Sequence, residues 1–257
     1  MIPAGPQRID LNGDIGEGTG AAGIAADASL MESLSSVNIA CGGHAGDSES
    51  MRTLVRMARE RGLAIGAHPG FPDRPGFGRR RLDFPLDAVR TFVTSQIESL
   101  RQIAAEEAAT VSHVKPHGSL YAMAAEDDIL ADAVACAVLQ IDPQSILVGL
   151  SGSALIAAGR RVGLRTASEV FVDRGYEADG SLTPRGGPGS LLTNPSAAAA
   201  RVVRMLREGV VSSRQGSDVA VVANTACIHG DTPGASTFAQ QVKALLVTAG
   251  FVVTRLA

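Results

Sequence analysis

Ionisable residues of this 257-residue sequence gather directly after its predicted strands. Four of the five histidines come just past the carboxyl end of such a strand, and the fifth, His113, lies inside one. The polar residues at these strand ends are Asn12, Asp14, His44, His68, Asp73, Arg79, Lys115, His117, Asp173, Arg174, His229 and Asp231. Because the carboxyl ends of parallel strands carry the active sites of α/β sheets and barrels, we expect these side chains to converge on one polar site.

Each of these residues alone has a simpler structural explanation. An Asp after a strand is most often a turn former or a helix cap, which applies to Asp14, Asp47 and Asp231. A single histidine there is usually a hydrogen-bonded structural residue, and Arg79 begins a run of three arginines that could simply be solvated. The whole set is harder to explain in this way, since each unpaired ion that loses its water costs several kcal/mol.

The residue types favour hydrolysis, either by acid–base groups or with a metal ion. The sequence contains no G-x-x-x-x-G-K-[ST] phosphate loop, and the glycine-rich segment after the first strand lacks the order G-x-G-x-x-G. Carboxylates and imidazoles suit general acid–base catalysis, whereas a metal ion would be held by Asp14, His44 and His68. Ligands on separate strands have no diagnostic spacing, so both alternatives stay open. Lys115 and Arg174 indicate an anionic group on the substrate.

Short β-rich runs alternate with helical patterns along the chain. The predicted strands are Arg8–Asn12, Ser36–Ala40, Leu63–Ala67, Val111–Lys115, Ile146–Leu150, Thr166–Val172 and Val219–Cys227. The predicted helices are Ser48–Arg61, Leu86–Glu107, Asp127–Gln140, Ser153–Arg161, Pro195–Glu208 and Pro233–Ala249. Strict alternation predicts an α/β fold with a parallel sheet covered by helices, either a closed barrel or an open doubly wound sheet.

Several local features refine this arrangement. Asp47 or Ser48 is expected to cap the helix that follows, and Pro195 to lie in the first turn of a later helix. His113 shares a strand face with Lys115, so it either points inward with that lysine or supports it. The Gly/Pro-rich stretch 174–189 is more typical of a lid or a binding loop than of a domain boundary, so we expect a single domain over residues 1–257.

Composition excludes several classes of protein. Hydrophobic residues make up 45% and charged residues 19%, which favours a large core over disorder. The net charge of −3 and the lack of a basic run argue against nucleic-acid binding. The N-terminus does not resemble a signal peptide, and no apolar run is long enough for a membrane span. The three separated cysteines form no CxxC motif, so we expect reduced thiols in a cytoplasmic protein.

At its polar motifs the sequence closely resembles the LamB/YcsF family, whose members are described as the A subunits of 5-oxoprolinase. The stretches that carry the resemblance are IDLNGDIGEG (9–18), SSVNIACGGHAGD (35–47), IGAHPGFPDRPGFGRR (65–80), VKPHGSLY (114–121), EVFVDRGYEADGSLTPR (169–185) and CIHGD (227–231). They occur in the family's order. The fold that this resemblance implies is similar to the distorted seven-stranded β/α barrels of polysaccharide deacetylases, of the glycoside hydrolase/deacetylase type. That agrees with the seven strands predicted from pattern.

The resemblance also implies an activity: ATP-dependent opening of 5-oxo-L-proline (pyroglutamate) to L-glutamate. Partner subunits B and C would handle ATP and activate the lactam by phosphorylation, while this chain opens the ring. A divalent metal is left open, and no nucleic-acid or membrane partner is expected. The need for ATP is reasonable, because tethered reactants can reach effective molarities of about 10⁵ M or more, which favours ring closure.

We expect acidic, imidazole and cationic residues to have different roles in the reaction. Asp14 would act as general base or orient the water, with His44 and His68 as proton carriers or orienting groups. Lys115, His117 and Arg174 would hold the substrate carboxylate or the developing oxyanion. The remaining substrate-binding positions at the rim are Asn12, Asp73, Arg79, Asp173, His229 and Asp231. The alternatives are a stand-alone metal-dependent amide hydrolase or deacetylase, and a non-catalytic subunit that binds a carboxylate.

Overall fold

The strands of the computed structural model close into a parallel barrel. The structure describes residues 7–230 and 234–256. Neighbours in the ring follow the order β1-β2-β3-β4-β5-β6-β9, and β9 also pairs with β1, which closes the ring. These strands are β1 (Arg8–Ile15), β2 (Ser36–Ala40), β3 (Ala64–His68), β4 (Val111–Val114), β5 (Ile146–Leu150), β6 (Arg165–Phe171) and β9 (Thr225–Cys227). The closed ring confirms the predicted seven-stranded β/α barrel and rules out the open sheet.

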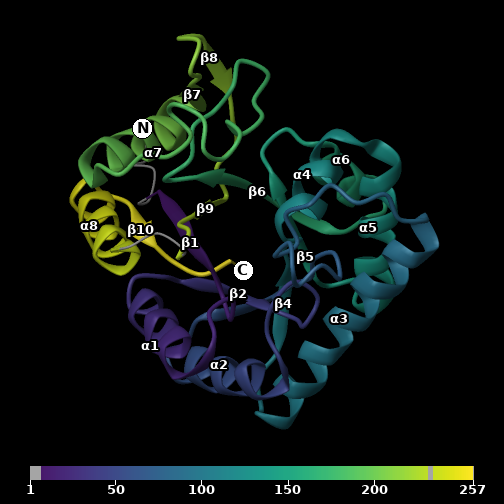
Figure 1. Cartoon of the computed structure of the whole chain (residues 1–257). Helices are drawn as coiled ribbons and strands as arrows, with labels where there is room; N and C mark the ends of the chain where they lie inside the picture. The colour runs from purple at the N-terminus through teal and green to yellow at the C-terminus, as the bar shows by residue number, and fades with distance from the viewer. Residues whose placement is uncertain (1–6, 231–233, 257) are drawn as a thin grey trace.

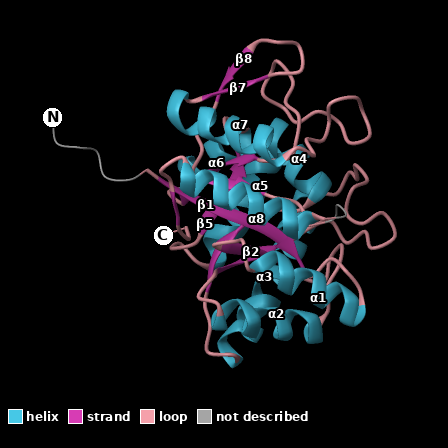
Figure 2. Ribbon diagram, turned by 90° about the vertical axis from the view of Figure 1, so that its left-hand side faces the viewer, coloured by secondary structure: helices cyan, strands magenta, loops and turns pink. Residues whose placement is uncertain are grey.

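Helices surround the barrel on its outside, as Figure 1 shows in a view into the ring of strands. They are α1 (Gly20–Met31), α2 (Ser48–Glu60), α3 (Leu86–Glu106), α4 (Gly118–Glu126), α5 (Asp128–Ile141), α6 (Ala154–Arg161), α7 (Pro195–Glu208) and α8 (Ala235–Thr248). A short antiparallel hairpin, β7 (Val210–Ser212) with β8 (Asp218–Ala220), follows α7, and β10 (Val252–Val253) pairs with the start of β1. In Figure 2 the long loops project mainly from one end of the barrel.

Alternation along the strands places apolar side chains outside and polar side chains inside. In β1, Ile9 and Leu11 belong to the apolar core, whereas Asn12 and Asp14 bond to groups inside the barrel. Successive side chains of a strand point to opposite faces, so Asp10, Asn12 and Asp14 share the inner face. The barrel therefore has an apolar layer between strands and helices and a largely polar interior, which leads toward the carboxyl ends of the strands.

The structure corrects several predicted elements. The predicted strand Val219–Cys227 is two strands: β8 pairs with β7 outside the barrel, and only β9 belongs to the ring. Strand β1 runs on to Ile15, so Asn12 and Asp14 lie within it and not after it. Helices α1 and α4 were not predicted. Helix α1 is rich in Gly and Ala and buries only Leu30 and Met31, so it lacks the apolar periodicity that predicts a helix.

The starts of α2 and α7 agree with the capping and first-turn residues that the sequence predicted. The Asp47 carboxylate caps α2 by accepting from the backbone of Glu49 and Ser50. Pro195 is in the first turn of α7, and Asn194 caps that helix. The predicted start of the last helix at Pro233 lies outside the described residues, whose helix α8 begins at Ala235.

None of the three cysteines, Cys41, Cys136 and Cys227, forms a disulfide in the structure. No helix within residues 7–230 and 234–256 has the length and apolar character needed to cross a bilayer.

Candidate active site

A cleft of about 420 Å³ opens at the carboxyl ends of the barrel strands. Many of the predicted site residues line it, although they are far apart in the sequence. The acidic, basic and histidine residues that line it are Asp14, Glu17, His68, Arg79, Arg81, Lys115, His117, Glu126, Arg174, Arg185 and His229. The acidic and imidazole groups lie beside one another, while four arginines contribute to the wall. The cleft thus combines a reactive inner part with a cationic lining.

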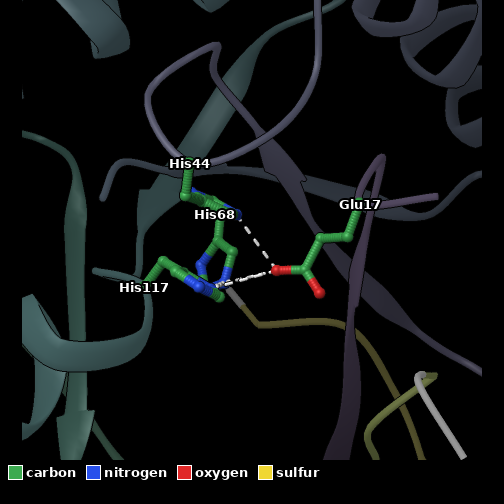
Figure 3. Close-up of side chains that lie close together, drawn as sticks. All are labelled: Glu17, His44, His68 and His117. Carbon is green, nitrogen blue, oxygen red and sulfur yellow. Dashed lines mark hydrogen bonds and ion pairs between the residues drawn. The ribbon is translucent and has the colours of Figure 1, made fainter. Parts of the chain in front are cut away.

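Glu17 and three histidines form a compact cluster, which Figure 3 shows. Glu17 Oε1 lies 3.1 Å from His44 Nε2, 3.0 Å from His117 Nδ1 and 3.7 Å from His68 Nε2. The ring of His44 stacks on that of His117 with centroids 3.5 Å apart. The three imidazoles are buried and come from the ends of β2, β3 and β4. One carboxylate oxygen is therefore shared by three rings.

Backbone carbonyls orient two of these rings. His68 Nδ1 lies 2.7 Å from the carbonyl oxygen of Lys115, and His117 Nε2 lies 2.9 Å from that of Phe77. A carbonyl oxygen can only accept, so each of these nitrogens carries a proton and donates it. The opposite nitrogens, His68 Nε2 and His117 Nδ1, face each other at 3.1 Å beside Glu17.

Lys115 joins the cluster to the barrel interior. Its buried ammonium lies 2.9 Å from Asp14 Oδ1, 2.9 Å from Glu169 Oε1 and 3.1 Å from Cys227 Sγ. An ammonium has three N–H donors, so these acceptors and Asn12 Oδ1 at 3.3 Å already occupy it. Lys115 can therefore act on a substrate through its charge, while its hydrogen bonds hold the protein groups in place.

The charges of the site are set by burial and by close partners. Burial alone would raise the pKa of Asp14, but nearby His68, Lys115 and His229 outweigh it and lower the pKa well below its usual value. Burial opposes the charge of Lys115, yet Asp14, Cys227 and Glu169 raise the pKa of Lys115 well above its usual value. Asp14 and Lys115 thus form a charged pair at neutral pH.

Burial and hydrogen bonds also shift the pKa values of Glu17, His44 and His68 within the cluster. Burial lowers the pKa of His68 to about 3 and also lowers the pKa of His44. Burial would raise the pKa of Glu17, but hydrogen bonds with His117 and His44 reverse this and lower it. Glu17 is therefore a carboxylate at neutral pH, facing His68 and His44 rings that are predominantly neutral.

A polar network supports the site from below. Asn38 donates 2.8 Å hydrogen bonds to Asn12 Oδ1 and Asp14 Oδ1, and it contacts His113 Nε2 through Oδ1 at 3.0 Å. Glu169 accepts from Asn12 at 3.0 Å and from Tyr121 at 2.7 Å. His113 therefore lies inside the barrel and supports the site through Asn38.

Sequence reasoning missed the most central carboxylate of the cleft and much of this network. Glu17 is not among the predicted site residues, although its place three residues after Asp14 could have indicated a second acid at the same strand end. Glu169 interrupts a buried apolar strand, β6, with a charge, which is itself a signal for a paired functional group. Asn38 and Tyr121 gave no comparable signal, because neither carries a charge that would need a partner in the core.

Other predicted residues lie at the edge of the site or beyond it. Asp73 does not line the cleft, because it forms an ion pair with Arg80 and accepts from the backbone of Gly76. Arg174 lines the cleft and donates to the carbonyls of Ser190 and Thr183.

The remaining rim residues are similarly divided. The guanidinium of Arg79 lies 4.8 Å from the centre of the Phe77 ring. Asp173 bonds to His229 Nδ1 at 3.0 Å, which orients that imidazole beside the cleft. Asp231 lies outside the described residues.

Two groups of side chains in the described residues could hold a metal ion by their proximity. The first is the Glu17 cluster with His44, His68 and His117, and the second is Asp14 with Cys227 and His229. Asp14 does not belong to the first group, although its Oδ2 lies 3.5 Å from His68 Nε2. The geometry thus separates Asp14 from His44, which the sequence had placed in one ligand set.

The fold and the cleft define a β/α-barrel protein with an acid–imidazole site at the carboxyl ends of its strands. Residues 9–257 match the LamB/YcsF family, and the chain belongs to that family. This confirms the resemblance seen in the sequence motifs.

Named relatives are similar over nearly their whole length. The chain is 52% identical to the A subunit of the 5-oxoprolinase of Shouchella clausii over 245 residues, which covers 95% of this chain and 97% of the relative. It is 49% identical to the protein of the same name from Bacillus subtilis, with 96% of each chain covered.

Solved structures agree with the barrel. The lactam utilization protein from Thermus thermophilus superposes with a TM-score of 0.91 at 42% identity, covering 97% of this chain and 100% of that one. A structure described as T48 deacetylase has a TM-score of 0.50 at 14% identity, covering 97% of this chain and 88% of that one. The second likeness concerns the fold alone, and it agrees with the predicted relation to deacetylase barrels.

Proposed function

We propose that this chain is the ring-opening subunit of a 5-oxoprolinase, which converts 5-oxo-L-proline to L-glutamate. The observation that carries the proposal is the cleft in which charged Asp14 and Lys115 lie beside the Glu17–histidine cluster. The names of the relatives at about 50% identity give the lactam as substrate. A small lactam with one carboxylate fits a cleft that has acid and imidazole groups inside and arginines in its wall.

The residues divide the reaction as follows. Hydrolysis bonds a water oxygen to the ring carbonyl carbon, breaks the C–N bond and returns a proton to the amine. Asp14 orients the water and accepts its proton, and Lys115 stabilises the developing negative charge through its field. His68, whose Nε2 lies 3.5 Å from Asp14 Oδ2, is the orienting group beside Asp14, and His44 acts through its contact with Glu17. Arg174 and Arg79 in the cleft wall bind the substrate carboxylate.

The proposed ring opening also requires ATP and partner subunits. Ring closure of glutamate is favoured by the tether between its amine and its carboxyl group, so opening needs coupling to a favourable reaction. The sequence has no phosphate-loop motif, and we propose that ATP is bound largely by subunits B and C. A cytoplasmic location stays a prediction from the sequence.

Reconstitution tests this function directly. The chain is mixed with its candidate partner subunits, and glutamate formation from 5-oxoproline is measured with and without ATP. We expect formation to need all subunits and ATP, and Asp14→Asn to lower kcat by at least about 10²-fold. The matched control Asp128→Asn changes an exposed aspartate of α5 and should retain full activity. Full activity of a folded Asp14→Asn variant would contradict the assignment of Asp14.

A second candidate function is stand-alone metal-dependent hydrolysis of an amide, as in a deacetylase. The cluster of Glu17 with three histidines favours it, because such groups are common metal ligands. Turnover of an amide by the isolated chain without ATP would favour this candidate. Binding of 5-oxoproline without turnover in the complete complex would instead indicate a carboxylate-binding subunit.

A further inference from the structure

We propose that Glu17, His44, His68 and His117 form a binding site for one divalent transition-metal ion of the zinc type. The proposal concerns metal binding by this chain and does not depend on which amide the protein opens. Four side chains from three strand ends and the loop after β1 supply one ligand atom each, and all four atoms lie within 4.8 Å of one another. Figure 3 shows the four groups converging on one point.

The spacing of the ligand atoms matches a tetrahedral site. Ligands at about 2.0–2.1 Å from a tetrahedral zinc ion lie about 3.3 Å from one another. Glu17 Oε1 lies 3.0, 3.1 and 3.7 Å from the nitrogens of His117, His44 and His68. His68 Nε2 and His117 Nδ1 are 3.1 Å apart. These four separations lie within about 0.4 Å of the tetrahedral value, and no two of the four ligand atoms are more than 4.8 Å apart.

The ring orientations supply an independent argument. The carbonyls of Lys115 and Phe77 fix the protons of His68 and His117 on the nitrogens that point away from the cluster. His68 Nε2 and His117 Nδ1 are thereby turned toward Glu17 and toward each other at 3.1 Å. Once neither of these two nitrogens carries a proton, both can present a lone pair to the same cation. Carbonyl oxygens that orient the far nitrogen of a histidine are also the usual outer partners of metal-bound imidazoles.

The donor set selects the type of ion. Three imidazoles and one carboxylate suit zinc and its neighbours in the transition series, whereas magnesium and calcium prefer oxygen ligands. The second group in the described residues, Asp14 with Cys227 and His229, is less suitable. The ammonium of Lys115 already lies 2.9 Å from Asp14 Oδ1 and 3.1 Å from Cys227 Sγ, so a positive charge is in place there.

Metal binding is measured on the full chain without substrate, ATP or partners. The protein is treated with a chelator, dialysed, and titrated with Zn²⁺ by calorimetry and with Co²⁺ by visible absorption. We expect one equivalent to bind and the Co²⁺ form to show the intense bands of a tetrahedral site. Binding of no equivalent, or Co²⁺ bands of the weak octahedral type, would overturn the proposal.

Variants identify the ligands. His68→Gln should lower the affinity for Zn²⁺ by more than about 100-fold, since loss of an outer partner alone costs about 10- to 100-fold. Glu17→Gln, which keeps the shape of the side chain, should lower it by at least about 10-fold. The matched control His229→Gln changes a histidine of the other group and should bind as the wild type does. Loss of Zn²⁺ binding in His229→Gln alone would place the ion at Asp14 and Cys227 and overturn the assignment of the ligands. Circular dichroism checks that each variant is folded.

Discussion

Lys115 is the residue on which the charge balance of the site depends. It is buried beside two carboxylates, Asp14 and Glu169, and its hydrogen bonds are made with protein groups. A buried ion pair is costly to break from one side, because the remaining charge has no compensation. The same lysine therefore has a structural and an electrostatic role, and the two can be separated by mutation.

Replacing Lys115 tests this balance. Lys115→Met should lower the free energy of unfolding by about 3–5 kcal/mol, because Asp14 and Glu169 lose their cation. Adding Glu169→Gln removes one of the two unpaired charges, so the double variant should regain part of that stability while activity stays lost. Urea unfolding followed by circular dichroism measures the effect. An unfolding free energy of the single variant within about 1 kcal/mol of the wild-type value would contradict this expectation. A difference of that size is comparable to the uncertainty of about 10–15% that extrapolation from urea usually carries.

Strands β3 and β4 meet where a glycine makes room for a histidine. A Cβ atom on Gly66 would overlap the ring of His113, and the pairing of β3 with β4 shifts register between Ile65 and Gly66. The absence of a side chain at Gly66 thus allows the His113 imidazole to fit inside the barrel and reach Asn38. Gly66 therefore affects both the packing of β3 against β4 and the support that His113 gives to the site.

Gly66→Ala should destabilise the protein by about 1–3 kcal/mol through overpacking. Combination with His113→Ala removes the overlapping ring, so the double variant should be more stable than the sum of the two single effects. Thermal unfolding of all four members of the cycle measures this coupling. Simple additivity would show that the alanine is accommodated without contacting His113.

The cap of α2 lies next to a site motif but has a structural role. Asp47 follows His44 by three residues, and its carboxylate accepts from the first turn of the helix. Asp47→Ala should lower stability by about 0.5–2 kcal/mol, whereas Asp47→Asn should retain most of it. Activity per folded molecule should be unchanged in both. A loss of activity in a fully folded Asp47→Asn variant would instead place Asp47 in the reaction.

At the scale of the whole molecule, the polar barrel interior makes stability depend on pH. Burial lowers the pKa of His113 to about 3, below its usual value of 6.5. Between these values the unfolded chain binds a proton at this position and the folded chain does not. Stability from His113 is therefore complete above pH 6.5 and is lost as the pH falls toward 3.

Removing this group should make the protein less sensitive to acid. In His113→Gln the slope of the unfolding free energy against pH should be smaller by up to about 1.4 kcal/mol per pH unit between about pH 4 and 6. Urea unfolding at several pH values measures both slopes. Equal slopes would mean that His113 binds its proton equally in the folded and unfolded states.

The sequence by itself determined the order of the main elements, the α/β class and the end of the barrel at which the ionisable side chains gather. Those features are local: apolar periodicity marks strands and helices, and turn residues with His and Asp follow each strand. The single domain expected over residues 1–257 stays a prediction. Missed helices such as α1 and the division of Val219–Cys227 into β8 and β9 depended on pairing partners that are distant in sequence.

Only the tertiary structure decided which acids and bases touch. Glu17 joins His44, His68 and His117, whereas Asp14 pairs with Lys115, because strand register and ring closure set distances that sequence spacing does not contain. Asp73 was expected at the rim because, like Asp14, it follows a predicted strand. Its partner in the structure is instead Arg80, seven residues away. Contact between residues on different strands is a property of the closed barrel, and pKa values follow from that contact and from burial.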